Sequence, residues 1–105
     1  MQYNTATLIH PSALVAKDAK IEEGVVIMPG VIIRTGAIIK KYVIINSGVI
    51  IEHNSIIGEG SHVDPGATIL GSVECSACCM IGSRSIVTPE KQIAECSFIK
   101  AGSIY

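Results

Sequence analysis

The stretch that decides the fold runs from Val25 to Ile45 and reads VVIMPG VIIRTG AIIKKY VII. Within this stretch every sixth residue from Ile27 to Ile45 is an isoleucine, and a Val or Ala lies two positions before each of them. Residues two apart point to the same side of a strand, whereas a helix would repeat about every 3.6 residues. The stretch therefore predicts short strands separated by turns, with both repeated residues of each hexad facing the interior.

The six-residue register continues without an insertion from Ile9 to Ile99, and Gly recurs three residues after the inward aliphatic position, where a Cβ would be costly in a bend. The inward positions are Ile or Val in fifteen of sixteen cases: Ile9, Val15, Ile21, Ile27, Ile33, Ile39, Ile45, Ile51, Ile57, Val63, Ile69, Cys75, Ile81, Val87, Ile93 and Ile99. This pattern is typical of the hexapeptide repeat of an all-β parallel β-helix. Three hexads make one triangular coil of 18 residues, so 105/18 predicts about six coils.

The composition agrees with strands and excludes several classes of protein. The chain has 19 Ile and 9 Val but only 3 Leu, and β-branched residues favour strands over helical bundles. Hydrophobic residues are 49% and charged residues 16%, which excludes disorder. A net charge of −1 gives no reason to expect binding to nucleic acid or to a membrane surface. No apolar run approaches the ~18 residues of a spanning helix, and residues 1–6 lack a signal-peptide pattern, so we expect a cytoplasmic protein.

The residue before each inward aliphatic position is expected to face outward, and on two of the three faces these residues are mostly apolar. One column holds Val26, Ile44, His62, Met80 and Phe98, the next holds Ile32, Ile50, Thr68, Ile86 and Ile104, and the third, more polar column holds Lys20, Ile38, Ile56, Glu74 and Gln92. Two apolar faces form a large exposed patch unless they are covered. A three-sided prism that packs through such faces predicts a closed homotrimer.

Two of the three histidines are placed by the register on opposite sides of the prism. His53 falls at a corner and His62 on a flat face, nine residues or half a coil later. Within one chain these side chains cannot meet, so a site that uses both is expected to form between chains. Histidine changes its charge near neutral pH and suits the base of an acyl transfer, although a lone surface histidine often has no catalytic role.

Four segments carry a resemblance to a known family: HPSA at 10–13, GVVIMPG at 24–30, INSGVIIEHN at 45–54 and IGEGSHVDPGA at 57–67. With these segments the chain resembles the hexapeptide-repeat acyltransferases of the sialic-acid O-acetyltransferase and bacillosamine N-acetyltransferase type, over nearly its whole length. The Glu-His pair followed nine residues later by Ser-His is the most specific feature. The resemblance implies a left-handed β-helix, acetyl-CoA as co-substrate and a sugar or nucleotide-sugar as acceptor.

The resemblance also implies roles for individual residues. The family's general base falls on His53, and the histidine that contacts acetyl-CoA falls on His62. A backbone amide that holds the acetyl oxygen falls on Gly71, which is otherwise explained equally well as a turn glycine. Ser83 and Ala101 match positions that line the coenzyme channel.

The chain departs from the family pattern in three places. An acidic residue often follows the base, but here it is Asn54, which can orient an imidazole without adding charge. The family's N-terminal α/β domain and its C-terminal tail have no counterpart in this sequence. We therefore expect a leading segment over residues 1–8 and a β-helix acetyltransferase domain over residues 9–105.

Two functions from different classes remain open. The first is an acetyl-CoA-dependent acetyltransferase with His53 and Asn54 at its catalytic centre. The second is a non-catalytic trimerising β-helix module, favoured by the missing flanking parts and by Asn54.

The four cysteines do not favour a metal site. The register places Cys75 and Cys79 in inward slots, where they serve as small core residues, and their side chains diverge from Cys78. Cys78 and Cys96 share one corner position, 18 residues apart. The histidine spacing does not fit the zinc site of a γ-class carbonic anhydrase, and the Thr ladders of an ice-binding β-helix are missing. We expect no metal.

Overall fold

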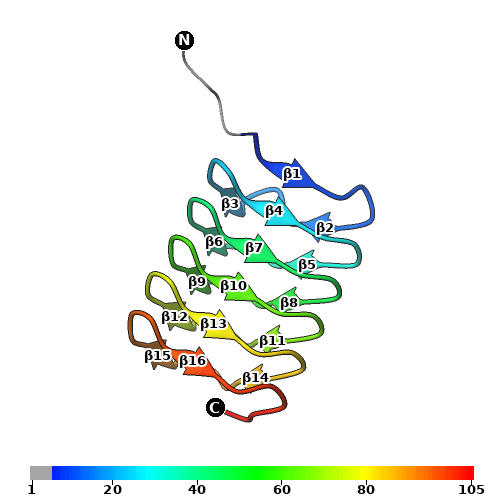
Figure 1. The fold of residues 1–105 in the computed structure, drawn as a ribbon. Helices are drawn as coiled ribbons and strands as arrows, with labels where there is room; N and C mark the ends of the chain where they lie inside the picture. The colour runs from blue at the N-terminus through cyan, green and yellow to red at the C-terminus, as the bar shows by residue number, and fades with distance from the viewer. Residues whose placement is uncertain (1–5) are drawn as a thin grey trace.

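The computed structural model describes residues 6–105, and sixteen two-residue strands are its regular elements (Figure 1). The strands are β1 (Leu8–Ile9), β2 (Leu14–Val15), β3 (Lys20–Ile21), β4 (Val26–Ile27), β5 (Ile32–Ile33), β6 (Ile38–Ile39), β7 (Ile44–Ile45), β8 (Ile50–Ile51), β9 (Ile56–Ile57), β10 (His62–Val63), β11 (Thr68–Ile69), β12 (Glu74–Cys75), β13 (Met80–Ile81), β14 (Ile86–Val87), β15 (Gln92–Ile93) and β16 (Phe98–Ile99). Each strand ends on an inward position of the hexad, so the predicted register is confirmed.

The strands form three parallel sheets that are the sides of a prism. Their orders are β1-β4-β7-β10-β13-β16, β2-β5-β8-β11-β14 and β3-β6-β9-β12-β15. Every pairing joins residues 18 apart, such as His62 with Met80. In Figure 1 the nearest sheet runs from left to right, the chain returns behind it, and successive coils descend, which is a left-handed path. The left-handed parallel β-helix expected from the resemblance is confirmed.

The number of coils is slightly lower than expected. Strands β1 to β15 make five complete coils, and β16 begins the next one. The estimate of six divided the whole length by 18 and so counted residues outside the strands. The leading segment expected over residues 1–8 lies largely outside the described residues, and β1 already begins at Leu8.

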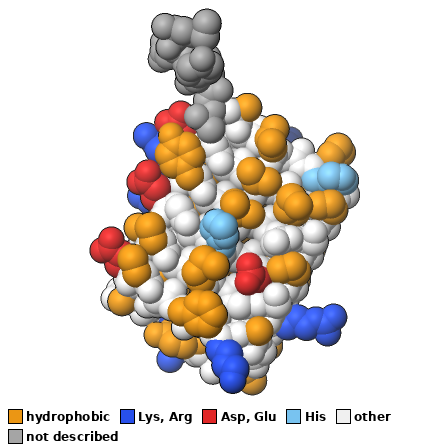
Figure 2. Space-filling view, viewed as in Figure 1, with side chains coloured by type: hydrophobic (Ala, Val, Ile, Leu, Met, Phe, Trp, Pro, Cys, Tyr) orange, Lys and Arg blue, Asp and Glu red, His pale blue; other side chains and the backbone are white. Residues whose placement is uncertain are grey.

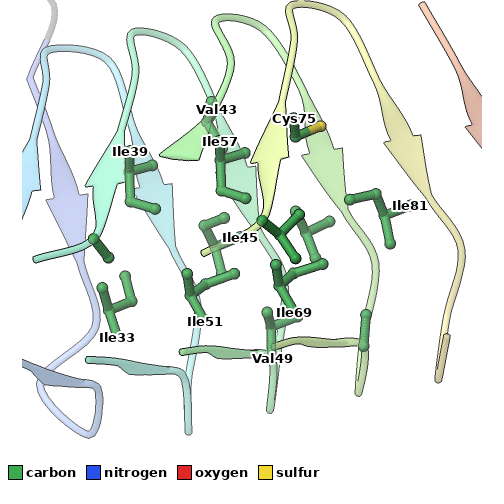
Figure 3. Close-up of a cluster of buried hydrophobic side chains, with 14 of the residues drawn as sticks. Ile33, Ile39, Val43, Ile45, Val49, Ile51, Ile57, Ile69, Cys75 and Ile81 are labelled. Carbon is green, nitrogen blue, oxygen red and sulfur yellow. The ribbon is translucent and has the colours of Figure 1, made fainter. Parts of the chain in front are cut away.

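The interior is a stack of aliphatic side chains drawn from all three sheets. Figure 3 shows Ile39, Ile57 and Cys75 in successive coils pointing inward, and each is at most 1% exposed. Buried serines in the small inward slots are satisfied by hydrogen bonds: Ser55 Oγ donates to Leu70 O at 2.8 Å and accepts from Val73 N at 3.1 Å. The first coil has fewer buried positions, and Ile9 there is 46% exposed.

Fourteen of the sixteen turns share a left-handed backbone conformation at their last residue, and the exceptions are the turns that end at Ser12 and Asp18. The seven glycines three residues after an inward position have φ between 70° and 75°. Seven other residues at the same turn position also have positive φ: Tyr42, Asn54, Ser72, Cys78, Arg84, Glu90 and Cys96. The left-handed conformation is uncommon for residues other than Gly and Asn, so the stacked coils impose it on side chains that do not favour it.

The prism has three faces, A, B and C, and three edges at which the turns lie. Face A consists of the outward residues of the β1-β4-β7-β10-β13-β16 sheet, face B those of the β2 sheet, and face C those of the β3 sheet. The AB edge comprises residues 10–12, 28–30, 46–48, 64–66, 82–84 and 100–102. The BC edge comprises residues 16–18, 34–36, 52–54, 70–72 and 88–90, and the CA edge comprises residues 22–24, 40–42, 58–60, 76–78 and 94–96.

The outward columns stack as the sequence predicts. Face A pairs Val26 with Ile44, His62 with Met80, and Met80 with Phe98. Figure 2 shows hydrophobic side chains spread over this face, and Phe98 is 74% exposed. No helix among residues 6–105 is long and apolar enough to span a bilayer.

Candidate active site

The histidine expected to act as a base lies at the BC edge, in the turn that follows β8. His53 is exposed, and its carbonyl oxygen accepts a hydrogen bond from Ser72 N at 2.9 Å. On the side of the preceding coil, Asn54 N donates to Thr35 O at 3.0 Å. The backbone of this corner is therefore held from both neighbouring coils, while the His53 side chain remains accessible from solvent.

The imidazole of His53 lies against the backbone of Gly71, one coil further on. An ideal Cβ built on Gly71 would lie 2.6 Å from Cε1 and 3.1 Å from Cδ2 of His53, and closer still to Nε2. Such separations are too short for non-bonded carbon atoms, whose optimal contact is about 3.5–4.0 Å. The ring thus occupies the space that any other side chain at position 71 would need.

In the part of the chain that the structure describes, the backbone of Gly71, a buried residue, is hydrogen-bonded through its carbonyl group only. Among the hydrogen bonds of residues 6–105, its carbonyl oxygen accepts from Glu90 N at 2.9 Å, but its N–H donates to no other group. The same turn position holds proline, which has no N–H, at 11, 29, 65 and 89. The turn therefore does not require this N–H, and the residue that carries it at position 71 lies against the His53 ring.

Asn54 is placed mainly by its backbone. Its φ is 58°, and Asn is one of the few residues besides Gly that adopts this region readily. Its side chain lies against Gly36 in the preceding coil, where an ideal Cβ would be 3.1 Å from Cγ of Asn54. No hydrogen bond within the described part of the chain joins the Asn54 side chain to the His53 ring. Orientation of the imidazole by Asn54 stays a prediction.

A hollow of about 760 Å³ opens beside His53 and extends over face B toward the N-terminal coils. It is lined by Leu14, Val15, Ala16, Ile32, Ile33, Arg34, Thr35, Glu52 and His53. Arg34 Nε lies 3.6 Å from Glu52 Oε1. Thr35 Oγ1 donates to Asp18 Oδ2 at 2.6 Å, and this bond, together with one from Gly36 N, lowers the pKa of Asp18 below its usual value. The hollow thus joins an apolar floor to a rim that carries the Arg34–Glu52 ion pair and His53.

The remaining predicted site residues lie elsewhere on the prism. His62 is half-buried on face A, between Ile44 and Met80. Ser83 and Ala101 stack in adjacent coils at the AB edge, where Gly102 N donates to Ser83 O at 2.9 Å. The chain therefore brings His53 and Gly71 together, but it places His62, Ser83 and Ala101 on a different part of the surface.

Comparison with solved structures identifies close structural relatives. The acetyltransferase domain of PglB from Neisseria gonorrhoeae FA1090, in complex with acetyl coenzyme A, has a TM-score of 0.96 and 25% identity, covering 98% of this chain and 50% of that one. A second structure of the same domain has a TM-score of 0.95 and 26% identity, with 98% and 51% covered. Among curated proteins no match is found. The family model that matches is the GMPPB C-terminal domain, over residues 3–104.

The chain belongs to the GMPPB C-terminal domain family.

The chain spans about half the length of the solved structures that it matches. A mutant of GDP-perosamine N-acetyl transferase from Caulobacter crescentus, in complex with CoA and GDP-perosamine, is more distant, with a TM-score of 0.67 and 24% identity over 87% of this chain and 52% of that one. At that identity the likeness shows the fold alone. The resemblance to hexapeptide-repeat acyltransferases is confirmed by the likeness to the PglB acetyltransferase domain.

The sequence did not identify Arg34 or Glu52, which lie near His53, as site residues. Arg34 and Glu52 line the hollow and form an ion pair. They are 18 residues apart at the same turn position of the BC edge, so their opposite charges could have predicted the ion pair from the sequence. The hollow itself was not readable, because its depth depends on how the side chains of Leu14 and Ile32 lie.

The four cysteines follow the register. Cys75 and Cys79 are buried, whereas Cys78 and Cys96 are exposed at the CA edge, and all four are free thiols. Burial, with a contribution from the Cys79 thiol, raises the pKa of Cys75 to about 12. Partial desolvation and the neighbouring Cys78 thiol raise the pKa of Cys96. Within residues 6–105 no three His, Cys, Asp or Glu side chains are grouped as metal ligands would be.

Mild oxidation with glutathione disulfide is expected to join Cys78 to Cys96. Stacked neighbours are about 4.8 Å apart, which is within the Cα separation of about 4.4–6.8 Å that a disulfide tolerates. Cys75 is buried and resists ionisation, so it supplies little of the thiolate that exchange requires. Peptide mapping of the oxidised protein measures the outcome. A Cys75–Cys78 link as the main product would contradict the placement of these side chains.

Proposed function

We propose that this chain is the β-helix domain of an acetyl-CoA-dependent acetyltransferase that modifies an amino or hydroxyl group of a sugar or nucleotide-sugar. The observation that carries the proposal is the likeness to the PglB acetyltransferase domain in complex with acetyl coenzyme A, with a TM-score of 0.96 over 98% of this chain. The exposed His53, seated on Gly71 beside a hollow, supplies a base at a point that an acceptor can reach.

In the proposed reaction His53 is the general base. It takes a proton from the acceptor's amine or hydroxyl, and the freed lone pair attacks the carbonyl carbon of the acetyl thioester. The tetrahedral intermediate then collapses, the carbon–sulfur bond breaks, and CoA leaves as its thiol after receiving the proton that His53 had taken, which regenerates the base. The products are the acetylated sugar and CoA. Asn54, in place of an acidic neighbour, adds no charge to this step.

The free N–H of Gly71 is the proposed donor to the acetyl oxygen. A preorganised donor aimed at an oxyanion is worth about 10²–10³-fold in rate in well-studied cases. His62, Ser83 and Ala101 are the proposed contacts for acetyl-CoA. Because they lie on face A and the AB edge, the complete site requires the BC edge of one subunit to meet face A of another. This arrangement fits the expected homotrimer.

Calorimetry with acetyl-CoA tests the proposal most directly. We expect saturable binding by the wild-type chain, and weaker binding by the His62→Ala variant, with His10→Ala as a control at a histidine outside the proposed site. Release of CoA thiol from acetyl-CoA with GDP-perosamine as acceptor is the accompanying activity assay. No binding of acetyl-CoA would favour the alternative, a non-catalytic trimerising β-helix.

Light scattering is expected to give three times the 11.0 kDa mass of one chain. Met80 on face A is 39% exposed and Ile86 on face B is also 39% exposed, so one chain leaves apolar side chains uncovered on both faces. A charge placed in an apolar interface is costly to bury. Met80→Glu is therefore expected to lower the measured mass, whereas Gln92→Glu on face C leaves it unchanged. A monomer mass for the wild type at micromolar concentration would contradict both the trimer and the shared site.

A further inference from the structure

We infer that Gly71 is a positioning residue for His53, because the absence of a Cβ at this turn leaves the space that the imidazole ring occupies. We call this space beside Gly71 the seat of His53. This role is separate from donation by the Gly71 amide, because it concerns the side chain that glycine lacks. The inference rests on the proposed function, in which His53 is the base. It also makes a structural claim that holds whether or not the chain is active.

The turn does not require glycine at position 71. Gly71 is absent from the residues with positive φ, and the left-handed conformation of this corner belongs to Ser72, at φ 57°. Every other corner carries a side chain at the equivalent position. These residues are Pro11, Lys17, Glu23, Pro29, Thr35, Lys41, Ser47, His53, Glu59, Pro65, Ala77, Ser83, Pro89, Glu95 and Ala101. Backbone conformation therefore does not explain why this one corner has none.

Close packing of backbones does not explain it either. Two other glycines, Gly58 and Gly82, also lack a positive φ. They lie one residue earlier in their turns than Gly71 does in its own, and an ideal Cβ on either would meet backbone atoms of the next coil. For Gly58 the nearest atoms include Ala77 N at 2.6 Å, and for Gly82 they include Ala101 Cα at 2.7 Å. For Gly71 the three nearest atoms all belong to the His53 ring. The space that glycine leaves at position 71 is filled by the His53 side chain and not by backbone atoms of a neighbouring coil.

The seat has a direct consequence for the chemistry of the site. Nε2 is the ring atom nearest to the missing Cβ, so it lies beside the residue whose N–H is free. The base and the proposed oxyanion donor are thereby held at one place on the BC edge. A Cβ at position 71 would push the ring away from this place while leaving the N–H where it is.

The variant that tests the seat is Gly71→Ala, because alanine adds the Cβ, keeps the N–H and is tolerated at the same turn position at Ala77 and Ala101. We expect kcat to fall by about tenfold or more, since small displacements of catalytic groups can cost about 10²-fold. The KM for acetyl-CoA is expected to stay within about twofold, because the backbone donor is retained. Ala77→Gly, which changes the same Cβ at the CA edge, is the matched control and is expected to leave kcat unchanged.

A double-mutant cycle assigns the effect to His53. In a His53→Ala background, adding Gly71→Ala is expected to cause no further loss of kcat, because the ring that the Cβ displaces is gone. An equal loss in both backgrounds would overturn the inference. So would a fall in the melting temperature that accounts for the loss of activity.

Nuclear Overhauser contacts provide a readout that does not depend on activity. The wild type is expected to show contacts between the His53 ring protons and the Gly71 Hα protons, and Gly71→Ala is expected to change their pattern and the ring chemical shifts. Absence of the contacts in the wild type would overturn the seat itself. If the contacts are present but the wild type does not bind acetyl-CoA, the seat is supported and the proposed function is overturned.

Discussion

Replacing His53 by alanine is expected to lower kcat for acetyl transfer by about 10²-fold or more, the usual scale for the loss of a general base. The side chain is exposed, and the hydrogen bonds at this corner are made by backbone atoms. The fold should therefore survive the change, and the KM for acetyl-CoA should change little. Steady-state kinetics of CoA release, with the melting temperature measured in parallel, gives both quantities.

His10→Ala is the matched control for this variant. His10 is also an exposed turn histidine, and its Nδ1 lies 2.8 Å from Ser12 Oγ at the AB edge, away from the BC edge. The His10→Ala variant therefore removes the same kind of side chain from a comparable surface position. An unchanged kcat for His53→Ala would mean that another group is the base, and the same fall for His10→Ala would mean that the loss is not specific to the BC edge.

The fold was almost fully readable from the sequence because the hexad constrains each residue by one rule. Ile45 faces inward and Ile44 outward, as do the residues that they pair with one coil away. Once the phase of the six-residue repeat is known, it therefore determines which residue of every strand faces the interior. The turns were less readable. Gly48 signals its left-handed conformation, but Tyr42 holds the same conformation only because the coils above and below dictate the path of the chain.

The site was readable only in part, for a different reason. The 18-residue offset stacks Gly71 on His53, but periodicity does not determine how a side chain rotates once it leaves the corner. The contact between the ring and Gly71 depends on that rotation. For Asn54, the backbone conformation of the corner explains the residue better than contact with the imidazole does.

A substitution in the interior is expected to have the second large effect, on the stability of the fold. Ile57→Ala is expected to lower the free energy of unfolding by about 2–5 kcal/mol, the range for truncating a buried isoleucine. Ile57 is fully buried and stacks between Ile39 and Cys75 (Figure 3). The strands on either side are held by ladder hydrogen bonds, so the coils cannot close in and a cavity remains. Urea titration monitored by circular dichroism measures the change.

Ile56→Ala removes the same atoms from the neighbouring residue of β9 and is the matched control. Ile56 faces outward on face C, the most polar of the three, and is partly exposed. Its truncation removes less area from the interior and leaves no enclosed cavity, so a loss of about 1 kcal/mol is expected. All variants must be compared at one protein concentration, because association contributes to apparent stability. Equal losses for the two variants would contradict the assignment of Ile57 to the core, and with it the phase that places His53 at the BC edge.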